Sequence, residues 1–269
     1  MGAPCLSLEG RVAIVTGSRR GIGRAIALIF AEAGADVAVG DYVAGSELDT
    51  VADEIKKLGR RSVVTRVDVT DSDSVNGWVK KVENEFGSID ILANAAGILK
   101  VGPMIDLPPA EWDRVLDTNL KGIYLTSQAA AREMIKRKKG CIINVASTDA
   151  FNASPYQTAY NCSKAGVRML TNILAFELGR YGIRVNAVAP GWVRTKMTDY
   201  LETESFMEAA VANIAIGRIA EPRDIANVAL FLASDLADYV SGATWRVDGG
   251  FAQPSLSEWP ESAPMGGQE

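Results

Sequence analysis

Short runs of β-branched residues alternate with longer amphipathic stretches along most of the chain, and this alternation restricts the fold more than any other feature. Strands that alternate with helices usually pair in parallel, and the helices then cover both faces of the sheet. We therefore predict an α/β fold with a doubly wound parallel sheet of about seven strands. The expected strands cover residues 11–16, 36–41, 62–67, 89–94, 141–146, 183–190 and 243–248.

The 269 residues contain no repeat and no internal segment rich in Pro, Gly or Ser, so we expect one domain over residues 1–252. Residues 253–269 differ in composition, because Pro, Ser, Gly and Glu are prominent there. A segment of this kind can bury little apolar surface, which predicts an extended or flexible C-terminal tail.

Charge and composition argue against several classes of partner and site. The net charge of -5 disfavours nucleic acid and anionic membranes as partners. No apolar run approaches the roughly 20 residues that span a bilayer, and the first residues do not resemble a secretory signal, so we expect a cytoplasmic protein. The 3 cysteines are far apart and histidine is absent, which disfavours a metal site and excludes a Ser-His-Asp triad.

A glycine-rich turn, TGSRRGIG (16–23), lies where the first expected strand meets the first expected helix. Gly17, Gly21 and Gly23 allow positive φ values and a close approach of phosphate oxygens. The helix N-terminus offers free N–H groups to a pyrophosphate. Close packing of the helix on the sheet would also require glycines, but the position between strand and helix favours a dinucleotide site.

The residue that ends the second expected strand bears on the choice of dinucleotide. Asp41 can accept hydrogen bonds from both ribose hydroxyls of NAD and would repel the 2′-phosphate of NADP. Arg19 and Arg20 favour the opposite choice, because guanidinium groups bind an additional phosphate. We give Asp41 more weight and predict NAD as the cofactor.

A tyrosine and a lysine four residues apart lie on an expected helix over residues 158–181. Tyr160 and Lys164 share one face of that helix, and an ammonium group near a phenol lowers the pKa of the phenol. The pair therefore predicts a general acid/base in a chain without histidine. Ser147 follows an expected strand at the edge where ligands bind, so it can hydrogen-bond a substrate oxygen. A surface pair and a capping serine are the alternatives.

These pieces together resemble the short-chain dehydrogenase/reductase family over residues 8–251. Several separate motifs agree with the family pattern in order and spacing. They are TGSRRGIG (16–23), NAAG (94–97), YNCSK (160–164) and APGWVRT (189–195). The resemblance implies a Rossmann-like domain, hydride transfer between a secondary alcohol and a carbonyl, and a homotetramer held together by long helices. An acidic residue at the position of Asp41 is usual in the NAD-dependent members.

The resemblance also implies a role for each matching residue. Tyr160 would exchange a proton with the substrate oxygen, Lys164 would bind the nicotinamide ribose, and Ser147 would hold the substrate oxygen. Asn119 would organise the water of a proton relay that ends at Lys164. The cofactor-binding residues that it implies are Gly17, Ser18, Arg19, Arg20, Gly21, Ile22, Gly23, Asp41, Tyr42, Asp68, Val69, Asn94, Ala95, Gly97, Tyr160, Lys164, Pro190, Gly191, Val193 and Thr195.

The substrate is a small molecule whose class depends on residues that flank the expected site. These are Asp149, Phe151, Gln157 and Trp192. None is basic, which disfavours small carboxylates, and Asp149 and Gln157 can hydrogen-bond hydroxyl groups. We therefore predict a polar neutral alcohol such as a sugar, polyol or cyclic alcohol. Two alternatives remain: an NADPH-dependent reductase of 3-oxoacyl thioesters, and a non-catalytic protein that senses a dinucleotide.

Overall fold

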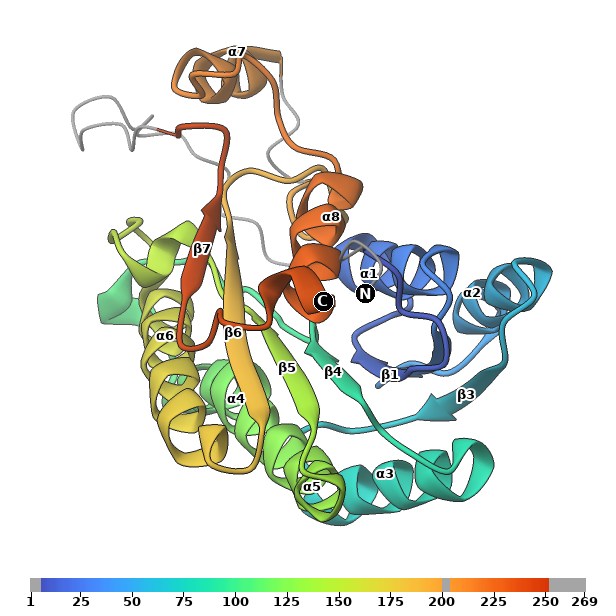
Figure 1. The fold of residues 1–269 in the computed structure, drawn as a ribbon. Coiled ribbons are helices and arrows are strands. Elements are labelled where there is room, and N and C mark those ends of the chain that lie inside the picture. The colour runs from blue at the N-terminus through green and yellow to red at the C-terminus, as the bar shows by residue number, and fades with distance from the viewer. Residues whose placement is uncertain (1–5, 200–203, 252–269) are drawn as a thin grey trace.

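The computed structural model describes residues 6–199 and 204–251. Seven parallel strands form one sheet in the order β3-β2-β1-β4-β5-β6-β7, which confirms the doubly wound fold (Figure 1). The strands are β1 (Val12–Thr16), β2 (Asp36–Asp41), β3 (Ser62–Arg66), β4 (Ile91–Asn94), β5 (Gly140–Val145), β6 (Ile183–Pro190) and β7 (Thr244–Val247).

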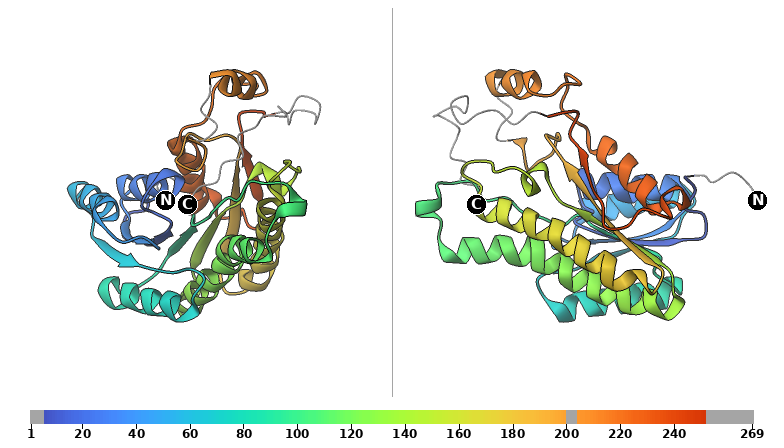
Figure 2. Two further views of the ribbon diagram at one scale, coloured as in Figure 1. Left: turned by 180° about the vertical axis from the view of Figure 1, so that it is seen from behind. Right: turned by 60° about the vertical axis from the view of Figure 1, so that its left-hand side comes forward.

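Helices cover both faces of this sheet. The α-helices are α1 (Gly21–Glu32), α2 (Ser46–Lys57), α3 (Ser72–Phe86), α4 (Pro109–Leu116), α5 (Gly122–Arg137), α6 (Thr158–Gly179), α7 (Glu204–Ala212) and α8 (Pro222–Ala233). Helices α1, α2 and α8 lie on one face and α3, α5 and α6 on the other, while α7 stands apart beyond the sheet (Figures 1 and 2). Short helical turns join these elements: η1 (Met104–Asp106), η2 (Asp117–Lys121), η3 (Thr148–Ala150) and η5 (Asp235–Ala237).

The central strands form a core on both of their faces, as their nearly continuous apolar runs require. All five residues of β1 are buried. Phe30 of α1 belongs to the core on one face, and Trp78 of α3 belongs to the core on the other. Burial of such large side chains supplies most of the driving force for this packing.

The strand order places a crevice at the carboxyl end of β1. The chain runs outward from β1 to β2 and β3 and then crosses back to β4, so β1 has neighbours whose connections leave in opposite directions. In doubly wound sheets this point of reversal is where ligands bind. The glycine-rich turn follows β1 directly and therefore lies at this crevice.

Several element ends differ from the expectations by one or two residues, for local reasons. The first expected helix, α1, ends at Glu32, and Gly34 beyond it adopts a φ of 104°. Helix α3 begins at Ser72 because the Asp71 side chain accepts a hydrogen bond from the backbone N–H of Asp73. The tail expected over 253–269 lies outside the described residues.

Within the described residues, no helix combines the length and the apolar character that crossing a bilayer requires.

Candidate active site

The turn between β1 and α1 has no room for a side chain at Gly17 or Gly23. Gly17 has a φ of 62°, and a Cβ there would lie 2.7 Å from the backbone of Ala96. A Cβ on Gly23 would lie 2.2 Å from the Gly17 carbonyl oxygen. The first turn of α1 contains no acidic residue, and Arg20 at its N-cap provides no side-chain cap. The N–H groups of this helix end are therefore free for an anionic ligand.

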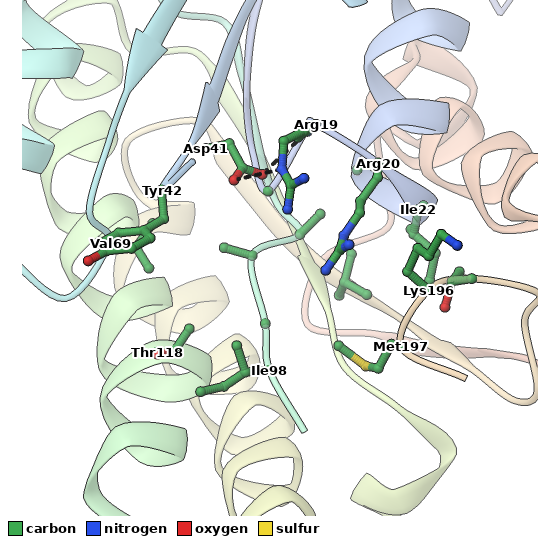
Figure 3. A pocket seen from close by; sticks show the side chains of 18 of the residues that line it. Arg19, Arg20, Ile22, Asp41, Tyr42, Val69, Ile98, Thr118, Lys196 and Met197 are labelled. Carbon is green, nitrogen blue, oxygen red and sulfur yellow. Dashed lines mark hydrogen bonds and ion pairs between the residues drawn. The ribbon is translucent and has the colours of Figure 1, made fainter. Parts of the chain in front are cut away.

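A cavity of about 640 Å³ extends from this turn along the carboxyl ends of the strands (Figure 3). All of the residues expected to bind cofactor line it, except Ser18 and Asn94. Ser147 also lines it, so the glycine turn and the expected catalytic groups share one space. The free N–H groups at the N-terminus of α1, the dipole of this helix and the elongated cavity fit a dinucleotide.

Ser18 and Asn94 are turned into the protein instead. The Ser18 hydroxyl donates to the Gly40 carbonyl at 3.2 Å and is fully buried. The Asn94 amide donates to Ser127 and Asn144, and its oxygen accepts from Thr126. Asn94 thereby links β4 to β5 and α5 and does not line the ribose side of the cavity.

Tyr160 and Lys164 lie together on α6, as their spacing predicted. The ammonium nitrogen of Lys164 is 5.5 Å from the centroid of the Tyr160 ring. It donates a hydrogen bond of 2.7 Å to the Val145 carbonyl at the end of β5. Burial lowers the pKa of Lys164 to about 8, and the charge of Asp149 opposes this effect. The lysine can thus act as a charged neighbour of the phenol near neutral pH.

Ser147 lies just beyond the carboxyl end of β5, where it is the N-cap of η3. Its side-chain oxygen accepts a hydrogen bond of 3.1 Å from the backbone N–H of Asp149. A hydroxyl whose oxygen already accepts one bond retains its own proton for another partner. Ser147 can therefore donate to an oxygen placed in the cavity.

Asn119 lies behind these groups and does not line the cavity. It sits in η2, a π-helical turn between α4 and α5, and its side chain is fully buried. Its amide exchanges two hydrogen bonds with the backbone of Ile98 and donates a third to Ser163. A Cβ on Gly97 would lie 3.4 Å from the Asn119 oxygen and 3.7 Å from the Lys164 nitrogen, so both side chains approach Gly97.

The family model of enoyl-(acyl carrier protein) reductases matches residues 17–252. A crystal structure of a short-chain type dehydrogenase/reductase from Mycobacterium marinum superimposes with a TM-score of 0.87 at 39% identity, covering 93% of this chain and 98% of the other. This chain is a short-chain dehydrogenase/reductase. It is therefore an oxidoreductase, and the family resemblance is confirmed.

Two curated relatives of this short-chain dehydrogenase/reductase bear on its substrate. The 3-oxoacyl-[acyl-carrier-protein] reductase FabG of Thermotoga maritima is 41% identical over 245 residues, which cover 91% of this chain and 99% of the relative. The FabG of Staphylococcus aureus is 43% identical over 238 residues, covering 88% and 96%.

The sugar or polyol prediction is wrong, because these relatives carry the name of the thioester reductase that the sequence left as an alternative. The four residues behind that prediction do not line the cavity. The guanidinium groups of Arg168 and Arg246 lie over the Phe151 ring, and Trp192 packs edge-on against Phe251. Gln157 is buried, and the carboxylate of Asp149 accepts a hydrogen bond from Ser154.

The prediction of NAD is also wrong, since the thioester reductase alternative was the one associated with NADPH. The geometry around Asp41 shows why this residue alone does not indicate NAD. Its carboxylate accepts from the backbone N–H of Val43 and lies 3.5 Å from the Arg19 guanidinium (Figure 3). An arginine 22 positions away therefore offsets its negative charge, while Arg20 extends into the cavity (Figure 3).

Several cavity residues of this short-chain dehydrogenase/reductase were not anticipated. Lys196, Met197 and Thr198 follow the Pro-Gly segment, and Arg114 and Thr118 come from α4 and η2. Of these five residues, only Lys196 carried a sequence signal, because it adjoins the last residue of the APGWVRT motif. The described residues contain no group of three or more Cys, Asp or Glu side chains that could hold a metal ion.

Proposed function

We propose that the protein is an NADPH-dependent reductase of a 3-oxoacyl thioester. One observation carries this proposal: Ser147, Tyr160 and Lys164 share a single cavity with the glycine turn in a chain 41% identical to a 3-oxoacyl reductase. The nucleotide and the reacting carbonyl then occupy neighbouring parts of the same space.

Each residue of the site has a separate role in the proposed reduction. NADPH, when bound, supplies a hydride to the carbonyl carbon. The Ser147 hydroxyl donates a hydrogen bond to the carbonyl oxygen and stabilises the charge that develops there. The Tyr160 phenol gives that oxygen its proton, and the Lys164 ammonium stabilises the phenolate that remains. A water held near Asn119 returns a proton through Lys164 after each turnover.

Two arginines favour the additional phosphate of NADPH. Arg20 lines the cavity, and no described carboxylate lies within ion-pair distance of it. Arg19 lies against Asp41 and also pairs with Glu47. A 2′-phosphate placed here can take over the Arg19 guanidinium from these carboxylates, because charge-assisted bonds to phosphate are strong.

A substrate panel with both cofactors tests this proposal. Purified protein should oxidise NADPH when an acetoacetyl thioester is added, with the thioester on an acyl carrier protein or on coenzyme A. NADH should support a slower reaction at equal concentration. Turnover of sugars or polyols with NAD, together with inactivity toward both thioesters, would contradict the proposal.

We further propose that the enzyme is a homotetramer in the cytoplasm. Helices α5 and α6 expose large apolar side chains, among them Tyr124, Met169, Ile173 and Phe176, the last at 91% exposure. Cys141 and Cys162 are free thiols, which suits a reducing compartment. Light scattering should give four times the mass of the chain, and Phe176→Asp should reduce that mass. A monomer at micromolar concentration would contradict the assembly.

A further inference from the structure

A carboxylate lies beside the catalytic groups without any part in the mechanism above. Asp149 belongs to η3, two residues after Ser147, and its side chain is mostly withdrawn from solvent. A carboxylate that is shielded from water destabilises the fold unless hydrogen bonds or opposite charges compensate for its lost hydration. The partners of Asp149 therefore indicate what it does.

The hydrogen bonds of Asp149 connect the segment of Ser147 with the segment that precedes Tyr160. Its backbone N–H donates to the Ser147 oxygen at 3.1 Å, and its carboxylate accepts from the Ser154 hydroxyl at 2.6 Å. The Ser154 carbonyl accepts in turn from the side chain of Asn161, which adjoins Tyr160 on α6. Through its backbone N–H and its carboxylate, Asp149 thus connects Ser147 with the start of the tyrosine helix.

The charge of Asp149 also acts on the site. Burial raises the pKa of Asp149, and the hydroxyls of Ser154 and Ser147 and the ammonium of Lys164 oppose that rise. Conversely, Asp149 opposes the burial that lowers the pKa of Lys164. The two charges therefore support each other.

Two other cations pack nearby, but they face the adjoining residue. The guanidinium carbons of Arg168, from α6, and Arg246, at β7, lie 4.5 and 6.0 Å from the Phe151 ring centroid. Arg246 is also paired with Asp248 at 2.6 Å. Within the described residues, Lys164 is the cation whose charge acts on Asp149.

We propose that Asp149 is a positioning residue of the catalytic centre, whose charge and hydrogen bond to Ser154 hold the Ser147 hydroxyl and the Lys164 ammonium in their working arrangement. It acts through these groups and does not touch the substrate. The inference rests on the proposed reduction, which requires a protonated Tyr160 beside a charged Lys164.

The pH dependence of kcat tests the electrostatic part of this role. Asp149→Asn removes the charge but keeps an oxygen for Ser154. Loss of the negative charge weakens proton binding by both Lys164 and Tyr160. As the pH is raised, the variant should therefore lose its reductase activity at a lower pH than the wild type does. We expect the alkaline limit of kcat to move down by about one pH unit. Asp149→Glu restores the charge and should move the limit back toward that of the wild type.

Two further variants separate this role from a structural one. Ser154→Ala removes the hydrogen bond and keeps the carboxylate, so it should lower kcat at every pH and leave the alkaline limit in place. Asp53→Asn makes the same charge change on exposed α2 and should leave the profile unchanged. A uniform loss of kcat in Asp149→Asn, with the limit unmoved, would mean a structural role only and would overturn the proposal.

Cofactor binding gives a readout that needs no turnover. Lys164 binds the nicotinamide ribose in the proposed mechanism, so dinucleotide affinity should weaken as its ammonium loses its proton. The pH at which this begins, followed by protein fluorescence, should also be lower in Asp149→Asn. If the wild type reduces no 3-oxoacyl thioester but this shift appears, the substrate proposal fails and the role of Asp149 stands. An unchanged binding profile overturns that role.

Discussion

The ammonium of Lys164 approaches the ring of Tyr160 to 5.5 Å while the same group donates a hydrogen bond to the Val145 carbonyl. The end of β5 therefore fixes the lysine that lies beside the tyrosine of α6. This anchor matters because a flexible lysine chain would otherwise point its charge into water. The sheet thus contributes directly to the proposed acid/base chemistry of Tyr160 and Lys164.

Replacement of Tyr160 by Phe should abolish most turnover without loss of cofactor. Removal of a general acid costs about 100-fold to 10,000-fold in rate. Steady-state kinetics should show kcat reduced by at least about 100-fold, whereas the NADPH dissociation constant should remain similar. Tyr239→Phe, at a fully exposed position, serves as the matched control. Full turnover in Tyr160→Phe would mean that another group is the general acid.

The buried lysine should make stability depend on pH. Burial lowers the pKa of Lys164 from 10.5 to about 8, so the unfolded chain binds more protons than the folded one between these values. The free energy of unfolding therefore gains up to about 3 kcal/mol from this group as pH rises through that window. Lys164→Met removes this gain.

Urea unfolding of the free enzyme at several pH values measures the effect. Any stability advantage of Lys164→Met over the wild type should be largest near neutral pH and should shrink as pH rises above about 8. Lys57→Met, on the exposed face of α2, should show no such trend. A difference between Lys164→Met and the wild type that stays constant over this range would show that the folded protein does not favour the neutral lysine.

Local spacing was enough to predict part of this site, because the groups involved belong to single elements. Gly17 directly follows β1, Gly23 lies in the first turn of α1, and Tyr160 and Lys164 are one helical turn apart. Their geometry therefore follows from backbone rules. Ser147 was predicted from its position after an expected strand, and the family resemblance added Asn119.

Contacts between segments that are distant in the sequence could not be predicted from local spacing. Asp41 appeared to be a free carboxylate because nothing in the sequence places Arg19 against it. Asp149 appeared to be a substrate ligand because the direction of its side chain depends on the short η3 turn and on Ser154. Asn94 points into the core because three polar partners on neighbouring elements receive it.

The glycine turn offers a matched pair of substitutions with opposite outcomes. A Cβ on Gly23 would lie 2.2 Å from the Gly17 carbonyl oxygen, so Gly23→Ala must distort the turn. Gly77, within α3, has no atom within 4 Å of its Cβ position. We expect Gly23→Ala to lose NADPH binding and Gly77→Ala to gain about 0.5 to 1 kcal/mol of stability. Calorimetric titration and urea unfolding check the two outcomes, and normal cofactor affinity in Gly23→Ala would contradict the phosphate-binding turn.

The proposed preference for NADPH should depend on Arg20, which lines the cavity and pairs with no described carboxylate. A charge-assisted contact to phosphate contributes about 1.5 to 3 kcal/mol, so Arg20→Ala should weaken NADPH binding by about tenfold or more. NADH, which lacks the 2′-phosphate, should bind almost as it does to the wild type. Arg24→Ala is the control, because Arg24 pairs with Glu54 and does not line the cavity. Equal losses for NADPH and NADH would place Arg20 at the pyrophosphate and leave the 2′-phosphate to Arg19.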